Sequence, residues 1–324
     1  TYKKIGSDFF KTYYESNTYL LGKELVEEGL TKKVFYQKED SSVWIDLTPD
    51  GLDEKIVRRK DGTSVYMTQD IGLAQLKQKE FNTDASIYVV GDEQNYHFKV
   101  LKLICQKLKQ PAADGIYHLS YGMVELPTGK MKSREGTVVD ADDLVDEMIN
   151  ISKEKTEALG KVSDFTKEQL TELYNTIGLG ALKFFLLRVD PKKKMIFNPE
   201  ESIDFHGFTG PFIQYTHARI KSILRKTGTA VNITPNELLP LEKQLAIELS
   251  TFPEVVNEAA DNLDPSKLAI YTFNLAKLFN TFYAEHSISN AESEVKKQLR
   301  IQLGILTAAT LQKAMSALGI AVPE

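Results

Sequence analysis

The residues best suited to chemistry lie in a short basic loop, GKMKSREGTVV, at residues 129–139. Lys130, Lys132 and Arg134 place three positive charges beside Ser133, and glycines flank the run. The loop follows an expected strand, so its cations can close on the phosphates of a nucleotide. The alternative is a charged loop that is merely solvated, which is the commoner role of such runs.

A second group of useful side chains lies on an expected helix over residues 211–226. The whole chain has a formal net charge of -5, so it cannot hold RNA by bulk charge. RNA binding then needs a local basic patch with aromatic and amide groups. We predict tRNA contacts from Gln214, Tyr215, Arg219, Lys221 and Arg225, with Lys226 and His217 nearby. The alternative is a solvated helix face, with Phe212, Tyr215 and Leu224 in the core.

The basic loop must be positioned by an α/β region over residues 56–125. Residues 87–91 (IYVVG) are a β-branched apolar run, typical of a buried parallel strand. Apolar residues at helical spacing follow, and a second strand pattern begins at residue 116. This order predicts a right-handed crossover in a parallel sheet, which binds ligands at the carboxyl ends of its strands. Upstream, residues 34–47 alternate like a hairpin with a polar turn at 40–42.

From residue 140 onward the pattern is almost wholly helical, and we expect no strand there. The proline- and lysine-containing loop at 190–202 is interpreted as a domain boundary. After it we expect helices over 211–226, 241–262 with a break at Pro253, 265–286 and 291–318. Short loops favour an antiparallel bundle. Its core should hold most of Tyr271, Phe273, Leu275, Leu278, Phe279 and Phe282, whereas the pattern leaves Tyr283 ambiguous.

Composition excludes several classes of protein. The 324 residues, 42% hydrophobic and 26% charged, fit two or three globular domains and not wholesale disorder. A single cysteine, Cys105, excludes an internal disulfide and a multi-cysteine zinc site, and we predict no bound metal. The apolar runs are too short to cross a bilayer, and the first residues do not form a signal peptide. We expect a soluble, cytoplasmic protein with no membrane partner, whose natural N-terminus has been removed.

The basic loop resembles the KMSKS loop of class I aminoacyl-tRNA synthetases, in the arginyl-tRNA synthetase form K-M-S-T-R-x-G-x-V-V. Lys130, Met131 and Arg134 match its lysine, methionine and arginine, and residues 136–139 match its tail. Lys132 replaces the usual serine, and Ser133 stands where a second lysine would be. The resemblance implies catalytic roles for Lys130, Lys132, Ser133 and Arg134, and ATP contacts from Gly129, Lys130 and Met131.

Two further segments carry the same resemblance. RRKDGTSVYMTQDIGLA, residues 58–74, resembles R-x-D-G-T-x-x-Y-x-T-R-D-I, with Gln69 in place of an arginine. This implies that Tyr66 and Asp70 bind arginine, because a carboxylate and an aromatic wall suit a planar guanidinium. VVGDEQNYHFKVLK, residues 89–102, resembles V-G-x-x-Q-x-x-H-F, which implies that Gln94 binds arginine and His97 binds ATP. Without the resemblance, Asp70 reads as a helix N-cap, Tyr66 as a core aromatic and His97 as a neutral, hydrogen-bonded histidine.

The helical half of the chain also resembles the arginyl-tRNA synthetase family. GFTGPFIQYTHARIKSILRK, residues 207–226, resembles the first helix of the family's anticodon-binding bundle, and the ending GIAVPE resembles its G-I-x-V-P-E ending. The resemblance implies an α/β plus all-α fold: the second half of a Rossmann-like catalytic domain, then a helical anticodon-binding bundle. The implied parts are a catalytic-domain remnant or insertion (1–55), the Rossmann-like half with the basic loop (56–150), a helical stem (151–204) and the anticodon-binding domain (205–324).

None of the five histidines forms the family's His-x-Gly-His turn. We expect that turn and the family's N-terminal domain to precede residue 1, so that this chain is the C-terminal portion. The resemblance implies that the whole enzyme attaches arginine to its tRNA with ATP and Mg²⁺, as a monomer, and that this portion alone is inactive or very weak. Two alternatives stay open: another class I synthetase, such as a glutamyl enzyme, and a non-catalytic RNA-binding module.

Overall fold

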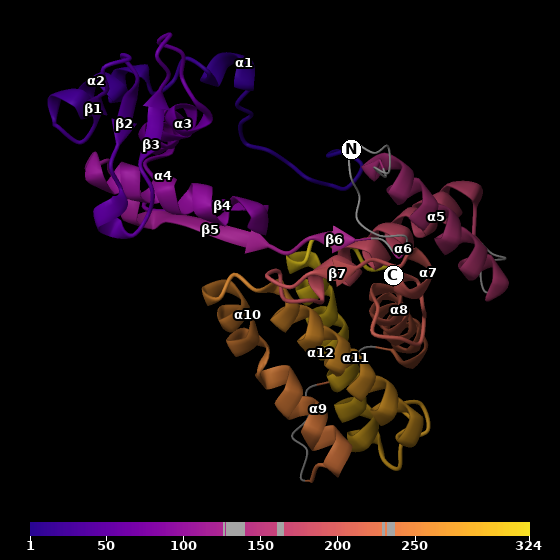
Figure 1. Ribbon diagram of the computed structural model, residues 1–324. Coiled ribbons are helices and arrows are strands. Elements are labelled where there is room, and N and C mark those ends of the chain that lie inside the picture. Colours follow the sequence, from indigo (N-terminus) through magenta and orange to yellow (C-terminus); the bar gives the residue numbers. More distant parts are fainter. Residues whose placement is uncertain (126, 128–139, 161–164, 229–230, 232–236) are drawn as a thin grey trace. The chain divides into compact units, whose positions relative to one another are not determined.

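The computed structural model describes residues 1–125, 127, 140–160, 165–228, 231 and 237–324. The chain forms two compact units (Figure 1), which are described separately. The α/β unit is Phe9–Met123, and the helical unit comprises Thr1–Asp8 and Val124–Glu324. The four-part division expected from the sequence has other boundaries, and it remains a prediction.

The α/β unit begins with helices α1 (Glu15–Thr18) and α2 (Lys23–Thr31), followed by a small antiparallel sheet. Its strands are β1 (Tyr36–Gln37), β2 (Val43–Ile45) and β3 (Lys55–Arg58), paired in the order β1-β2-β3. The predicted hairpin is confirmed, since β1 and β2 are antiparallel neighbours. In the turn between them, the Asp40 carboxylate accepts a hydrogen bond from the Ser42 N–H at 3.0 Å.

The second part of this unit is the predicted strand–helix–strand. Helix α3 (Tyr66–Phe81) precedes strand β4 (Ser86–Gly91), helix α4 (Asn95–Lys107) and strand β5 (Ile116–Tyr121). Strands β4 and β5 pair in parallel along their whole length, which confirms the predicted parallel pairing of two strands joined by a helix. Short 3-10 turns lie at η1 (Thr48–Asp50), η2 (Asp92–Gln94) and η3 (Ala113–Gly115). The core joins residues from both parts: Val43, Ile45, Leu47, Val57, Leu101 and Ile104.

The expectation that residues 87–91 form a strand is confirmed, but the expectation that this strand is buried is wrong. Ile87 is 50% exposed and Val89 is 63% exposed, whereas Tyr88, between them, packs on Phe98 with ring centroids 5.0 Å apart. Successive side chains of a strand point to opposite faces. Within the α/β unit, residues of β4 are therefore covered on one face only.

The helical unit contains two long helices, α5 (Ala141–Ala158) and α6 (Lys167–Leu187), followed by the short α7 (Pro199–Ser202). Contrary to the expectation of no strand after residue 140, β7 (Met195–Ile196) pairs in parallel with β6 (Val124–Glu125). The pairing is two residues long, which is too short to give an alternating pattern in the sequence.

The remaining helices are α8 (Gly210–Thr227), α9 (Pro240–Ser250), α10 (Phe252–Asp261), α11 (Pro265–Glu285) and α12 (Glu294–Ala317). The predicted break at Pro253 is confirmed, because α9 ends and α10 begins within two residues of it. Side chains cap several helices: Thr209 accepts from the Phe212 N–H, Asp264 from Ser266 and Ser293 from Lys296.

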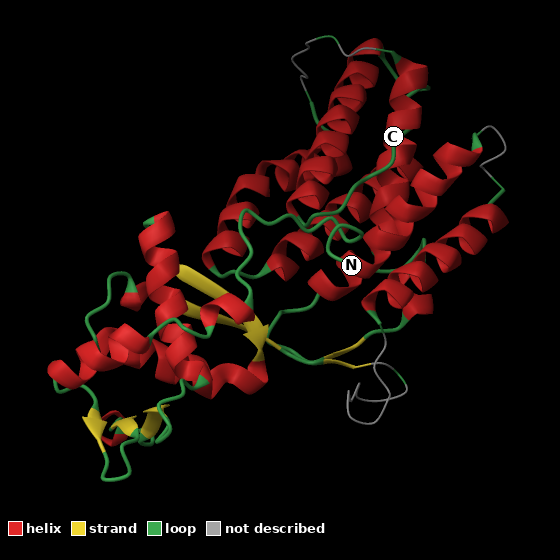
Figure 2. Ribbon diagram, turned by 90° about the horizontal axis from the view of Figure 1, so that it is seen from above, coloured by secondary structure: helices red, strands yellow, loops and turns green. Residues whose placement is uncertain are grey.

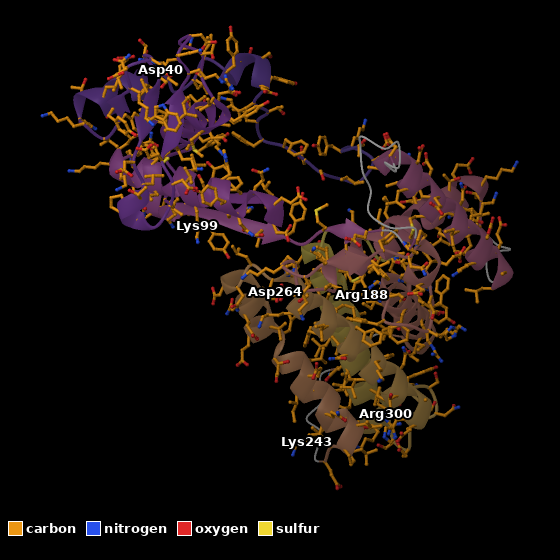
Figure 3. All side chains as sticks on the ribbon, in the orientation of Figure 1. Asp40, Lys99, Arg188, Lys243, Asp264 and Arg300 are labelled. Carbon is orange, nitrogen blue, oxygen red and sulfur yellow. The ribbon has the colours of Figure 1, made fainter. Side chains whose placement is uncertain are left out.

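Helices α8, α11 and α12 pack against one another around an apolar core (Figure 1). Figure 2 shows that helices make up most of this unit. The prediction for that core is confirmed: Tyr271, Leu275, Phe279 and Phe282 are buried, and Phe273 and Leu278 pack against them. The bundle also buries charge. Arg300 on α12, labelled in Figure 3, is almost completely enclosed.

Candidate active site and RNA-binding face

The residues predicted to bind arginine lie on helix α3 and in the 3-10 turn η2 of the α/β unit. Tyr66 is the first residue of α3, and its side chain is 70% exposed. Asp70 lies one turn later, on the same face of the helix. Because α3 begins at Tyr66 after Val65, the alternative of Asp70 as an N-cap is wrong, and so is that of Tyr66 as a core aromatic. Gln94 ends η2 directly after β4 and is exposed.

The structure brings Asp70 into contact with His97, which lies in the first turn of α4. The His97 Nε2 and Asp70 Oδ2 atoms are 2.7 Å apart, a hydrogen-bonding distance. The two side chains are 27% and 39% exposed, so water or a ligand can reach the pair. Two helices thus present a carboxylate and an imidazole just beyond the carboxyl end of β4, where parallel sheets bind ligands.

A pocket of about 260 Å³ adjoins this pair. Its wall is largely apolar and aromatic, and it is formed by Lys55, Ile56, Val65, Tyr66, Met67, Tyr96, His97 and Val100. The Lys55 ammonium lies 4.6 Å from the centre of the Tyr96 ring. Apolar walls with a few polar groups at the rim are the usual form of a small-molecule site.

The Asp70 charge also acts on the interior behind the pair. Burial raises the pKa of Tyr88 to about 12, and the charges of Cys105 and Asp70 add to this shift. Burial raises the pKa of Cys105 to about 12 as well, with Asp70 again contributing. Burial lowers the pKa of Lys77, whose ammonium lies 4.2 Å from the centre of the Tyr88 ring, while Asp70 opposes that shift. The Asp70 charge thus influences the pKa values of all three groups.

The predicted phosphate-binding residues lie outside the described part of the structure. They are Gly129, Lys130, Met131, Lys132, Ser133 and Arg134. Their roles therefore remain predictions.

Helix α8 of the helical unit carries the predicted RNA contacts. Tyr215 is 37% exposed, and Arg219 and Arg225 are exposed too. The Arg219 guanidinium lies 5.0 Å from the centre of the Tyr283 ring on α11. Lys221 is half-buried and forms an ion pair with Glu324 at 3.4 Å. Arg219 and Tyr283 thus place a cation beside an aromatic ring, a combination that suits the binding of unpaired bases, whereas Lys221 and Arg225 lie on other sides of the helix.

Gln214 does not fit its predicted role. Its side chain is 1% exposed, and its amide nitrogen donates to the main-chain oxygens of Thr176 at 2.9 Å and Ala321 at 2.8 Å. A Cβ atom on Gly180 would approach the same nitrogen to 2.3 Å, so this glycine makes room for it. Gln214 therefore ties α8 to α6 and to the C-terminal segment.

Two features were not predicted from the sequence. The Asp70–His97 pair joins residues 27 positions apart, and no local pattern links such positions. Tyr283, ambiguous in the sequence, forms the platform under Arg219 and lies parallel to Phe279. Its position one turn after Phe279 on a helix was a usable signal.

Among the described residues, no group of three or more histidine, cysteine or acidic side chains is arranged to hold a metal ion. Within the same residues, no helix is both long and apolar enough to span a membrane.

Comparison with known sequences gives matches over nearly the whole chain. Residues 16–198 match the family described as "tRNA synthetases class I (R), catalytic domain", and residues 213–324 match "DALR anticodon binding domain". The chain is 54% identical over 333 residues to the "Arginine--tRNA ligase" of Amoebophilus asiaticus, and 56% identical over 326 residues to that of Flavobacterium psychrophilum. These matches cover all of this chain but 56% and 54% of the relatives, so the chain spans about half their length.

Solved structures show the same fold. The arginyl-tRNA synthetase of Thermus thermophilus superposes with a TM-score of 0.88 at 24% identity, over 99% of this chain and 61% of that one. The arginyl-tRNA synthetase of Plasmodium falciparum superposes with a TM-score of 0.81 at 20% identity, over 100% of this chain and 55% of that one. The predicted fold, a Rossmann-like class I catalytic region followed by a helical anticodon-binding bundle, is confirmed. The catalytic-family match alone covers more than half of the sequence, and the chain belongs to the class I arginyl-tRNA synthetase family.

Proposed function

We propose that the protein carrying this chain attaches arginine to its tRNA at the expense of ATP. The observation that carries the proposal is the partly exposed Asp70 carboxylate. It lies one helical turn from Tyr66, which lines the small pocket. A guanidinium is a planar cation with five donors, and a carboxylate can accept two of its N–H groups in parallel. Family membership supports arginine as the ligand, with Gln94 as a further contact.

The proposed reaction has two steps. The arginine carboxylate attacks the α-phosphate of ATP, which forms arginyl-adenylate and releases pyrophosphate. A hydroxyl of the tRNA end then attacks the adenylate carbonyl, and AMP leaves. Catalysis of this kind depends mainly on positioning and on stabilising charge at the phosphates.

Phosphate contacts are assigned to the basic loop. We propose that Gly129, Lys130 and Met131 hold ATP, and that Lys130, Lys132, Ser133 and Arg134 stabilise the departing pyrophosphate. ATP would enter as its Mg²⁺ complex, with the phosphates as the main ligands of the ion.

The tRNA would bind the helical unit through Tyr215, Arg219, Lys221 and Arg225, with Tyr283 beside them. The match to the DALR anticodon-binding family supports an anticodon contact here. We also propose that the protein acts as a monomer in the cytoplasm. The 324-residue chain by itself should activate arginine weakly or not at all.

Aminoacylation by the full-length protein tests this function. Asp70→Asn keeps the shape of the side chain and removes its charge. We expect it to raise the KM for arginine roughly 100-fold, because a hydrogen bond to a charged group is worth up to about 3 kcal/mol. The control is Asp84→Asn, an exposed carboxylate of the same unit, which should change nothing.

Three results would refute the proposal. The first is an unchanged arginine KM in Asp70→Asn. The second is charging of a glutamate-accepting tRNA, which would indicate a glutamyl enzyme. The third is tRNA binding without activation of any amino acid, which would indicate an RNA-binding module.

A further inference from the structure

His97 and Asp70 lie on different helices, α4 and α3, and their hydrogen bond is well defined. An ionised carboxylate can only accept hydrogen bonds, so His97 Nε2 must carry the proton and donate it to Asp70 Oδ2. The ring of His97 also lies edge-on to that of Phe98, with centroids 5.7 Å apart. Phe98 in turn stacks on His118, with centroids 4.3 Å apart. The imidazole is therefore held on one side by packing and on the other by the carboxylate.

We infer that His97 is a positioning residue of the arginine site: it fixes the Asp70 carboxylate for the guanidinium of the substrate. This inference rests on the proposed function. The family resemblance implies that His97 binds ATP. In the structure, however, its Nε2 atom donates to the Asp70 carboxylate, which is proposed to bind arginine. Within the described residues Oδ2 alone has a partner, so Oδ1 is left to accept from the ligand.

The charge of His97 decides how strongly the pair attracts a cation. When His97 is neutral, the pair carries one negative charge, and the carboxylate is both ionised and oriented. When His97 is protonated, the pair is neutral overall and places a positive imidazolium beside the guanidinium. Unlike charges favour binding and like charges oppose it. A donor at this position that carries no positive charge should therefore suit a guanidinium best.

Several other ionisable groups surround the pair. Helix α3 supplies Tyr66 and Lys77, and α4 supplies Tyr96 and Cys105. Strand β3 adds Lys55, β4 adds Tyr88 and β5 adds His118. His118 is the other imidazole of this cluster, and its Nε2 atom lies 3.0 Å from the main-chain oxygen of Val90. It is therefore the natural control for His97.

The test measures the KM for arginine and for ATP in the full-length protein at pH 8. His97→Leu removes the donor and should raise the arginine KM at pH 8 about tenfold, because a lost hydrogen bond to a charged group is worth at least that factor. His97→Gln restores an N–H donor that cannot be protonated. It should recover most of the lost affinity for arginine. His118→Gln should keep the wild-type KM for both substrates.

Each outcome either supports or overturns the inference. Rescue of the arginine KM in His97→Gln, with an unchanged KM for ATP, supports it. A rise confined to the KM for ATP, or no rescue of the arginine KM in His97→Gln, overturns it and leaves the proposed function intact. Failure of the unsubstituted protein to use arginine at any pH overturns both.

Discussion

Glu242 on α9 and Arg300 on α12 are both almost completely buried, and they form an ion pair with Oε1 and Nε 3.0 Å apart. The remaining hydrogen-bonding groups of the pair are also used. Glu242 accepts from Lys296 at 2.6 Å, and Arg300 donates to Glu292 at 2.8 Å and to the Ser287 main-chain oxygen at 2.7 Å. Buried charge is tolerated in proteins when it is paired and fully hydrogen-bonded, as it is here.

We predict that Arg300→Met destabilises the helical unit by about 3–5 kcal/mol, because Glu242 is left as a buried charge without its main partner. Urea unfolding followed by far-UV circular dichroism measures this loss. The fluorescence of Trp44, the single tryptophan, reports the α/β unit and should keep its midpoint. Lys313→Ala, an exposed cation on the same helix, is the control and should stay within about 0.5 kcal/mol. An equal effect of both substitutions would contradict the prediction.

His217 should make the helical unit less stable in mild acid. Burial lowers the pKa of His217, and Lys221 adds to this effect, whereas the hydrogen bond to the Pro323 oxygen opposes it. The unfolded chain therefore binds a proton more readily than the folded one. The stabilisation is complete above the unfolded pKa, near 6.5, and is lost as pH falls through the lowered pKa of the folded state.

We expect His217→Asn, which can keep a donor toward Pro323, to flatten the fall in urea midpoint between pH 7 and pH 5. His206→Asn, at an exposed histidine of the same unit, should retain the fall. If His217→Asn leaves the pH dependence as it is, another group is responsible.

Local signals predicted much of the helical half. Thr209 before Gly210-Pro211 and Asp264 before Pro265 mark helix starts, because a side-chain oxygen caps the free N–H groups and proline suits the first turn. Burial was less predictable. An apolar run such as residues 87–91 looks the same whether one face or both faces of its strand are covered, and here Val89 is exposed. Gln214 was predicted to contact RNA because its amide group lies close to the basic residues in the sequence, but its position on the helix turns it into the core.

The geometry of the candidate site could also be predicted only in part. Tyr66 and Asp70 are four residues apart on a helix, so their common face follows from helix geometry alone. The partner of Asp70 is contributed by another helix, and only the packing of α3 against α4 brings His97 to it. Side-chain pairs of this kind depend on the fold and cannot be derived from sequence spacing.

Cys105 should be unreactive in the folded protein. It is completely buried, and burial raises the pKa of its thiol to about 12. The thiolate is the reactive form, and at pH 8 only about one Cys105 thiol in ten thousand would be ionised at any moment. We expect a disulfide reagent to label Cys105 only when urea unfolds the α/β unit, in parallel with the change in Trp44 fluorescence. Labelling at the rate of a free thiol in the absence of urea would contradict this.

Gly22 and Gly51 provide a matched pair in the α/β unit. Both have a left-handed backbone, with φ of +84° and +76°. A Cβ atom at Gly22 would lie 2.0 Å from the main-chain oxygen of Thr68, whereas nothing lies within 4 Å of one at Gly51. Alanine should cost about 1–2 kcal/mol at either position through backbone strain. At Gly22 overpacking should add roughly 1–3 kcal/mol.

The difference in stability between Gly22→Ala and Gly51→Ala therefore gives the cost of the close contact with Thr68. Urea unfolding followed by Trp44 fluorescence measures the stability of both variants. Equal midpoints for the two variants would show that α2 and α3 can separate at no cost.

Arg219 and Tyr283 should contribute to tRNA binding in different ways. The guanidinium lies 5.0 Å from the ring centre and can pair with a phosphate, while the ring can stack on an unpaired base. Arg219→Ala should weaken tRNA binding roughly tenfold and reduce the slope of log Kd against log salt by about 1. Tyr283→Leu should weaken binding to a similar degree but keep the slope, because no charge is lost. Filter binding at several salt concentrations separates the two, with Lys313→Ala as the control for a distant cation. An unchanged slope in Arg219→Ala would place the phosphate contacts of the tRNA elsewhere on the protein.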